Sequence, residues 1–249
     1  MLGLRHAAFA ALLVALQPSF AFSADYGGRY GYPPPPVEIG SGWYLRGDLG
    51  YRLYASPGLV YTETATPLTG TSAGGAFSFG GGFGYQFSEN FRGDLTADYA
   101  LPATFRGTLV GACTAGADCV HSMDVSVGTV MANAYWDLAT IGSMTPYVGA
   151  GVGVAYVTTS GNSAVDLNGP TTVAVPGASQ FNFAWALMGG ATWEMSPDVL
   201  VDLTFRLASF GSARTGPVPA AAGGDDTSPI TTGNIIAPEI RMGMRYRID

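Results

Sequence analysis

Aromatic residues alternate with very small residues in the segment 76–87, whose sequence is AFSFGGGFGYQF. Successive side chains of a strand point to opposite faces. One face therefore carries Phe77, Phe79, Phe83, Tyr85 and Phe87, and the other carries Ala76, Ser78, Gly80, Gly82, Gly84 and Gln86. A soluble sheet turns a polar face to water. The side chains of this second face are mostly too small to form such a solvent-exposed surface. The pattern is typical of a barrel wall with lipid outside and a narrow, crowded lumen inside.

The composition of the chain favours the same interpretation. Of 249 residues, 47% are hydrophobic and only 12% are charged, against about 25% charged in ordinary soluble domains. Past the N-terminus no run approaches the ~20 apolar residues of a membrane helix, so the apolar residues must be distributed by alternation. The net charge of −7 argues against nucleic acid as a partner, because nucleic acid requires a basic patch. All 11 basic residues are Arg, which suits fixed bidentate pairs with carboxylates.

The N-terminal segments predict export and a spacer. Residues 1–23 are predicted to be a signal peptide, with two basic residues, an apolar stretch and then small residues. Cleavage after Ala21 or after Ser23 would fit, and a membrane anchor is the alternative. Residues 24–41 are rich in Tyr, Gly and Pro and are predicted to be a periplasmic linker, stiffened by the prolines 33–36. A ligand for a proline-reading domain is the alternative there.

Residues 42–249 predict an outer-membrane barrel. Eight strands are expected, at about 43–54, 76–87, 90–101, 121–136, 145–157, 181–193, 199–208 and 235–248. The connections between them alternate between long and short, and the short ones hold turn residues. Bacterial barrels have short periplasmic turns and long external loops. The predicted fold is therefore all-β, an eight-stranded antiparallel up-and-down transmembrane β-barrel with both ends in the periplasm of a Gram-negative cell.

The period of two also predicts which side chains face lipid. These are Trp43, Leu45, Leu49, Tyr51, Leu53, Phe91, Leu95, Tyr99, Val148, Val152, Val154, Tyr156, Phe181, Phe183, Trp185, Leu187, Trp193, Val201, Leu203, Phe205, Ile240, Met242, Met244, Tyr246 and Ile248. The fourth strand is the least regular. Val125 and Val127 suggest one phase and Ala132, Ala134 and Trp136 the other, so we expect a bulge near Gly128.

The opposite faces of these strands carry nearly every charge. The predicted lumen charge network comprises Arg46, Asp48, Arg52, Arg92, Asp94, Asp98, Asp202, Arg206, Glu239, Arg241, Arg245 and Arg247. Isolated charges in so narrow a space would be costly, so interlocked Arg–carboxylate pairs are expected. Inward glycines of the second and fifth strands leave room for long Arg side chains. The network is either a structural plug or the lining of a narrow ion pathway, and a wide pore would need about twice as many strands.

Three further residues bear on chemistry. Cys113 and Cys119 are the only cysteines, and a close pair in an exported chain predicts a disulfide; a zinc pair is the alternative. His121 is the only histidine beyond the predicted signal and precedes Ser122. Adjacent strand residues point to opposite faces, which argues against their acting together as base and nucleophile. No catalytic, cofactor-binding or metal-binding residue is expected.

Three segments, GWYLRGDLGY, NAYWDL and PYVGAGVGVAY, resemble those of the small outer-membrane barrel proteins of alphaproteobacteria, a group described as porin-family or opacity-protein-like and similar to the OmpA-type barrel. The resemblance runs from residue 42 to the end. It implies eight strands, a part in membrane integrity and host contact, and no catalytic residues. It also implies assembly by the barrel-assembly machinery, although such barrels usually end in an aromatic residue and this one ends in Ile248 and Asp249.

The expected function is therefore that of a non-enzymatic barrel with a plugged polar lumen. It would support envelope integrity and contact a host or surface ligand through long external loops, with membrane lipid and lipopolysaccharide around it. A narrow ion or small-solute channel is the first alternative. An outer-membrane lipid-modifying enzyme that depends on His121 is the second.

Overall fold

The structure is a computed structural model that describes residues 42–248, except for residues 56, 112, 114–115 and 169–171. The predicted signal peptide, 1–23, and the predicted linker, 24–41, lie outside the described residues. Within the described part, no helix is long and apolar enough to cross a membrane.

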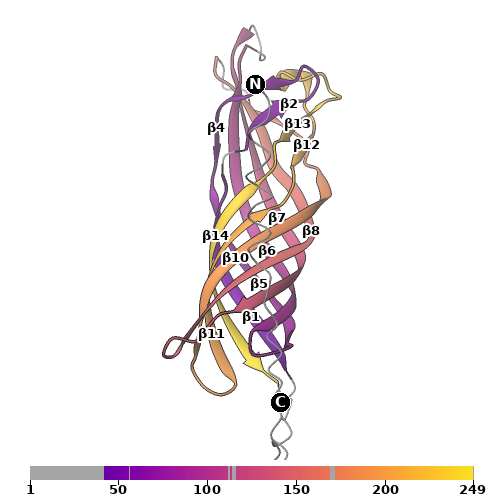
Figure 1. The fold of residues 1–249 in the computed structure, drawn as a ribbon. Coiled ribbons are helices and arrows are strands. Elements are labelled where there is room, and N and C mark those ends of the chain that lie inside the picture. The colour runs from indigo at the N-terminus through magenta and orange to yellow at the C-terminus, as the bar shows by residue number, and fades with distance from the viewer. Residues whose placement is uncertain (1–41, 56, 112, 114–115, 169–171, 249) are drawn as a thin grey trace, which may run out of the picture. The chain divides into compact units, whose positions relative to one another are not determined.

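Eight long strands form a closed antiparallel barrel (Figure 1). They are β1 (Trp43–Leu53), β5 (Gly75–Gln86), β6 (Phe91–Leu109), β7 (Cys119–Asp137), β8 (Met144–Asp166), β10 (Ser179–Glu194), β11 (Val199–Ser209) and β14 (Ile236–Arg247). Each pairs with its sequence neighbours in this series, and β14 returns to pair with β1, which closes the wall. The predicted fold class is confirmed.

The outer face of the wall is the apolar face that the period of two predicts. Leu49 is 70% exposed, Phe181 is 74% exposed and Met242 is 63% exposed, while the residues between them in each strand are buried or partly buried. Aromatic rings pair across neighbouring strands on this face, as Tyr51 does with Phe77 at 5.0 Å between ring centroids. An apolar band around a closed sheet is the surface that lipid requires.

The predicted bulge near Gly128 is wrong. Gly128 pairs regularly with Tyr99 on one side and Tyr156 on the other. Odd-numbered residues of β7 point inward and even-numbered ones outward along the whole strand. Val125 and Val127 therefore face the apolar interior at the end with the long connections, and Trp136 faces outward without any bulge. The irregularities lie instead in the neighbouring strands, between Ala100 and Ala103 of β6 and opposite Ser122–Asp124 of β7, where β8 carries an extra residue.

The long connections are more structured than predicted. Three strands of the wall, β6, β7 and β8, continue well beyond the others into the segments 102–120 and 158–180, where the sequence suggested loops (Figure 1). The sequence predicted loops in these segments because their outward residues are mostly Thr, Ser and Gly rather than apolar residues. Two short strands, β4 (Thr69–Ala73) and β9 (Thr172–Ala174), pair with the edges of this extension.

A second sheet lies at the same end of the barrel and is called here the cap. It is built from the first and last long connections and has the order β12 (Arg214–Pro217), β13 (Pro229–Thr232), β2 (Leu59–Tyr61) and β3 (Thr66–Pro67). A 3-10 turn, η2 (Ala220–Ala222), joins β12 to β13. Apolar residues of the cap and of the extension share one buried cluster, which includes Leu59, Phe105, Val125, Phe210 and Ile230.

Candidate functional site

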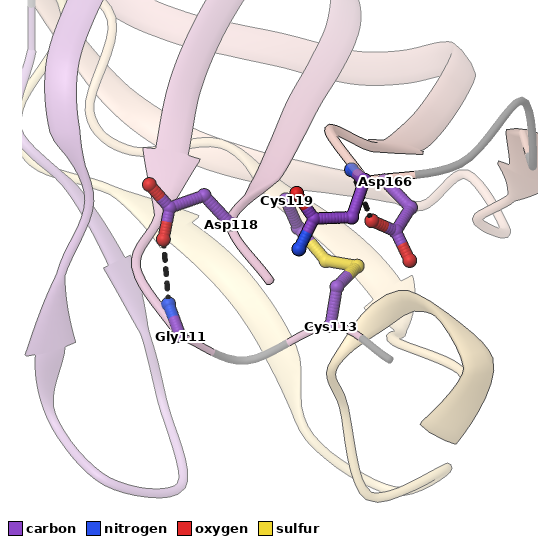
Figure 2. Close-up of a disulfide and its surroundings, with 6 residues drawn as sticks. Gly111, Cys113, Asp118, Cys119 and Asp166 are labelled. Atoms are coloured by element: carbon purple, nitrogen blue, oxygen red, sulfur yellow. Dashed lines mark hydrogen bonds between the residues drawn. A yellow bond between two sulfur atoms is a disulfide. The ribbon is translucent and has the colours of Figure 1, made fainter. Parts of the chain in front are cut away.

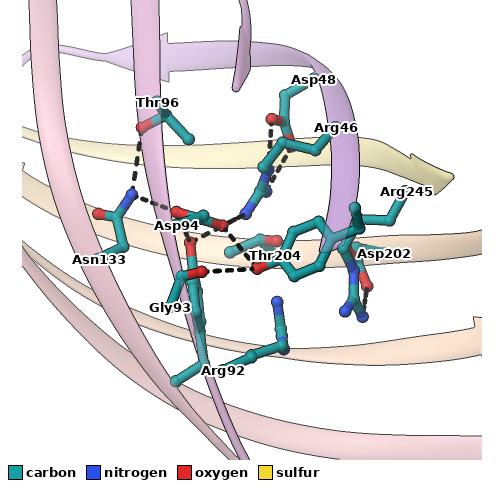
Figure 3. Close-up of polar contacts among 12 residues, drawn as sticks. Arg46, Asp48, Arg92, Gly93, Asp94, Thr96, Asn133, Asp202, Thr204 and Arg245 are labelled. Carbon is teal, nitrogen blue, oxygen red and sulfur yellow. Dashed lines mark hydrogen bonds and ion pairs between the residues drawn. The ribbon is translucent and has the colours of Figure 1, made fainter. Parts of the chain in front are cut away.

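The lower interior of the barrel, nearest the short turns, holds a group of ion pairs around Arg46 (Figure 3). The guanidinium of Arg46 donates to both carboxylate oxygens of Asp48, at 2.9 and 2.7 Å, and to Asp94 at 2.6 Å. Asp94 also accepts from the amide of Asn133 at 2.7 Å. These partners come from β1, β6 and β7, so the pairs tie three strands together across the interior.

A second ion pair, between Arg245 and Asp202, joins the neighbouring strands β14 and β11. Arg245 of β14 grips Asp202 of β11 through two nitrogens, at 2.7 and 2.9 Å, and donates to the Thr192 hydroxyl of β10 at 2.8 Å. Thr192 in turn donates to Asp202 at 2.6 Å. Asp202 is fully buried, and this bidentate geometry is the strong form of an Arg–carboxylate contact.

Arg92 is held by a residue that the sequence reasoning missed. Its Nε lies 3.0 Å from a carboxylate oxygen of Asp137, the last residue of β7. The guanidinium carbon also lies over two aromatic rings, 4.1 Å from the centroid of Tyr135 and 4.6 Å from that of Tyr147. The alternation of side chains along β7 places Asp137 inward and could have identified it. The predicted strand, however, ended at residue 136.

The upper group of charges centres on Asp98 and Glu239. Asp98 accepts from Arg241 and, at 3.2 Å, from Arg206. Glu239 lies 3.4 Å from Arg52 and 3.6 Å from Arg206, and it accepts from the Ser78 hydroxyl. The five charged side chains are each at most 5% exposed, and the Arg52 guanidinium lies over the ring of Phe210 at 4.4 Å, where the apolar cluster begins.

The buried charges of this network balance. The six arginines are Arg46, Arg52, Arg92, Arg206, Arg241 and Arg245, and the six carboxylates are Asp48, Asp94, Asp98, Asp137, Asp202 and Glu239. Each arginine lies within salt-bridge distance of at least one of these carboxylates. A neutral, cross-linked set of this kind avoids the large cost of an unpaired buried charge.

Inward glycines of β5 and β8 leave room for inward side chains of the neighbouring strands, here Asp98, Tyr44 and Tyr135 rather than the arginines that were predicted. A Cβ atom at Gly80 would overlap the carboxylate of Asp98, and one at Gly84 would overlap the ring of Tyr44. At Gly149 a Cβ would lie 2.5 Å from the ring of Tyr135. The glycine faces of β5 and β8 are therefore complementary to the long side chains opposite them.

Arg247 does not join this network, contrary to the sequence prediction. It has the inward parity, but β14 ends there, and its side chain is 46% exposed at the rim. It lies 3.5 Å from Glu194 and donates to the carbonyl of Pro197 at 2.7 Å. Beside it, a cavity of about 690 Å³ is lined by Asp137, Thr192, Arg245 and residues of the short turns.

At the other end of the barrel, Cys113 and Cys119 form a disulfide at the tip of the β6–β7 hairpin (Figure 2), with their Cα atoms 5.5 Å apart. The Asp118 carboxylate accepts from the backbone N–H of Gly111 at 2.9 Å. The Asp118 carbonyl accepts from the N–H of Leu167 at 3.1 Å. The bridge therefore fixes a tip that also contacts the segment after β8.

His121 lies on the cap side of β7 and Ser122 alternates to the outer side. The imidazole is 5% exposed, and its pKa is lowered to about 4 by burial. A small cavity beside it is lined by residues of the extension, including Phe105, Met123 and Asn162, and of the cap, including Leu59. Among the described residues, no group of three His, Cys, Asp or Glu side chains is arranged to hold a metal ion.

Comparisons with known proteins agree with this architecture. An uncharacterized protein of Brucella suis biovar 1 is 32% identical over 204 residues, which are 70% of this chain and 70% of that protein. A Rickettsia canadensis protein named "Putative adhesin" is 27% identical over 175 residues, covering 70% of this chain and 74% of that protein. Outer membrane protein PagN of Salmonella typhimurium is 33% identical over 143 residues, covering 53% and 58%.

Among solved structures, outer membrane protein OprG from Pseudomonas aeruginosa has the same fold, with a TM-score of 0.51 and 17% identity, covering 84% of this chain and 97% of that one. A family model described as outer membrane protein beta-barrel domain matches residues 7–236. Since that match covers most of the chain, the protein belongs to the outer membrane protein beta-barrel domain family and resides in the outer membrane.

Proposed function

We propose that this protein is a non-enzymatic surface barrel whose interior is a structural plug and whose activity is contact with a host or environmental surface. The observation that carries the proposal is the set of buried side chains inside the barrel. Six Arg and six carboxylates lie there, and an apolar cluster lies above them beneath the cap. A barrel of eight strands is only wide enough for side chains to fill it.

The outer end of the protein supports the surface role. The first and last long connections build the cap, and hydrogen bonds fix its turns. The Asp225 carboxylate accepts from the Tyr61 hydroxyl at 2.9 Å and from the N–H of Ser228 at 2.7 Å. The Thr227 hydroxyl also donates to this carboxylate, and that bond, together with the other two, holds the pKa of the Asp225 carboxyl well below its usual range. A rigid outer platform suits recognition, because little conformational entropy is lost on contact. The relative named as an adhesin supports the same role.

The catalytic alternative is not favoured by the geometry. His121 is directed into the cap and Ser122 to the outer side, so a nucleophile and its base would lie on opposite faces of one strand. For the channel alternative, a large cavity beside Arg247 opens into the lower interior, but buried ion pairs lie above that cavity.

Adhesion of intact cells tests the proposal. Cells lacking the protein are compared with cells that express the native chain, or a variant in which Tyr61→Phe and Asp225→Asn loosen the cap. Glu194→Gln at the periplasmic rim is the matched control. We expect adhesion to fall on deletion and with the cap variant at equal protein levels, and to be unchanged with the rim variant. Equal adhesion with and without the protein, on every surface tested, would refute the surface role.

A further inference from the structure

The outward side chains change character along three neighbouring strands of the wall, β7, β8 and β10. Their last apolar row is Gly128, Tyr156 and Phe181, whereas β5 and β6 stay apolar one step further, at Phe77 and Leu101. One step further along β7, β8 and β10, the outward residues are Ser126, Thr158 and Ser179, which are paired with one another. Aromatic rings gather where the membrane meets its polar layer. The hydroxyl row therefore begins where the lipid headgroups begin.

Hydroxyl side chains continue above that row on the extension of β6, β7 and β8. The next rows are Thr104–Asp124–Ser160 and Ser72–Arg106–Ser122–Ser163. The alternate residues of the same strands, including Phe105 and Met123, are buried under the cap. The hydroxyls therefore stand on the outer face, and rows follow one another at intervals of about 6.8 Å along the strands. We call these residues the hydroxyl face.

A groove opens just below the hydroxyl face, within the aromatic row. It has a volume of about 360 Å³ and is lined by Gly128, Val130, Val154, Tyr156 and Phe181, together with atoms of Thr129 and Asp98. The groove exists because Gly128 has no side chain between two tyrosines; a Cβ there would come no closer than 3.9 Å to the Tyr99 ring. Its walls are continuous with the lipid-facing band, so an acyl chain is the occupant that fits it.

The hydroxyl face fits sugars better than phosphates. Ser and Thr hydroxyls both donate and accept hydrogen bonds, which matches the hydroxyls of a sugar ring. The charged residues in the rows named above are Arg106 and Asp124, which have opposite signs. Part of the face is already ordered, since Thr104 donates to Asp124 at 2.7 Å and Thr158 contacts Ser179 at 3.2 Å.

We propose that the groove at Gly128 and the hydroxyl face together form a glycolipid site for the outer leaflet. One acyl chain lies in the groove, and the sugars attached to the same lipid lie against the hydroxyl face. The lipid bound at this site is lipopolysaccharide that carries core sugars, not phospholipid. It uses the outer side of β6–β8 and does not depend on the proposed plug or on adhesion.

Native mass spectrometry of the refolded full chain tests the site, with the fraction of lipid retained as the readout. Three probes are compared: lipopolysaccharide with complete core sugars, lipid A without core sugars, and phosphatidylglycerol. Gly128→Leu fills the groove. Gly47→Leu is the matched control, because Gly47 faces outward on β1 and a Cβ there meets nothing within 4 Å. The double variant Ser122→Val and Ser126→Val removes hydroxyls with residues that suit strands.

We expect the native chain to retain the sugar-bearing lipid about tenfold better than lipid A, since several hydrogen bonds distinguish the two lipids. Gly128→Leu should reduce retention of both by several-fold, and Gly47→Leu should change neither. The double variant should abolish only the preference for the sugar-bearing lipid. Equal retention of all three probes, an equal effect of the two leucine variants, or pairing of two chains through this face would each overturn the proposal.

Discussion

Replacing Asp98 by Asn should destabilise the barrel strongly without changing its shape. The Asp98 side chain is 0% exposed and accepts from both Arg206 and Arg241. Asn keeps the size of the side chain but removes the negative charge, which leaves those two guanidinium groups with Glu239 alone, at 3.6 and 3.8 Å. Two charge-assisted hydrogen bonds at about 1.5–3 kcal/mol each suggest a loss near the range of about 3–5 kcal/mol known for breaking buried pairs.

The free energy of unfolding in urea, measured for the refolded protein in lipid vesicles, checks this value. Glu194→Gln is the control, because the Glu194–Arg247 pair is separated by 3.5 Å and its side chains are 56% and 46% exposed. An exposed pair contributes at most about 1 kcal/mol. We expect a lower urea midpoint for Asp98→Asn with an unchanged slope. If both variants lost less than about 1 kcal/mol, the interior charges would not be locked together as described.

Three further perturbations follow from the same structure. Gly80→Ala should cost about 1–3 kcal/mol of unfolding free energy, because its Cβ would overlap the carboxylate of Asp98; Gly47→Ala, with open space, should cost far less in the same titration, and a similar loss would contradict this packing. The pKa of His121 is lowered to about 4 from an ordinary 6.5, so the unfolded chain takes up a proton first as the pH falls. Stability should therefore decrease by about 3 kcal/mol between pH 6.5 and pH 4, and a His121→Gln variant that kept this whole decrease would disprove the assignment. Cys113→Ser should lower stability by about 2–3 kcal/mol through loss of a short closed loop, measured against the oxidised native chain; a variant as stable as the native chain would show that the bridge constrains nothing.

The transmembrane part of the fold could be predicted from the sequence because every strand there obeys one rule. Lipid requires apolar side chains outside at every second position, and a narrow interior requires small or paired residues at the others. The segment 76–87 and the pairs Arg46–Asp48 of β1 and Arg92–Asp94 of β6 therefore indicate both that these residues form strands and which way each side chain points. The direction of each side chain then followed from parity. Eleven of the twelve predicted network residues point inward, and Arg247, the last residue of β14, is exposed at the rim.

Above the membrane the rule no longer holds. The outer side of the extension meets polar surroundings, while its inner side packs against the cap. The described residues 102–109 and 119–126 therefore carry mainly Thr, Ser, Arg and Asp outward and mainly apolar residues inward. Because of that inversion, the inward Val125 and Val127 and the outward Trp136 suggested two phases, which led to the wrong prediction of a bulge near Gly128. In the cap, β13 pairs with β2, and the paired residues Thr231 and Val60 are about 170 residues apart in the sequence. No local sequence pattern can predict such a pairing.

The conductance of the refolded protein in planar lipid bilayers tests the central claim most directly. A plug of six interlocked arginines and six carboxylates beneath an apolar core predicts no stable open channel, and Asp98→Asn should add at most brief, irregular openings. Long-lived, ion-selective conductance steps from the native chain that disappear with Arg46→Ala would contradict the plug and show that the charged interior is an ion pathway.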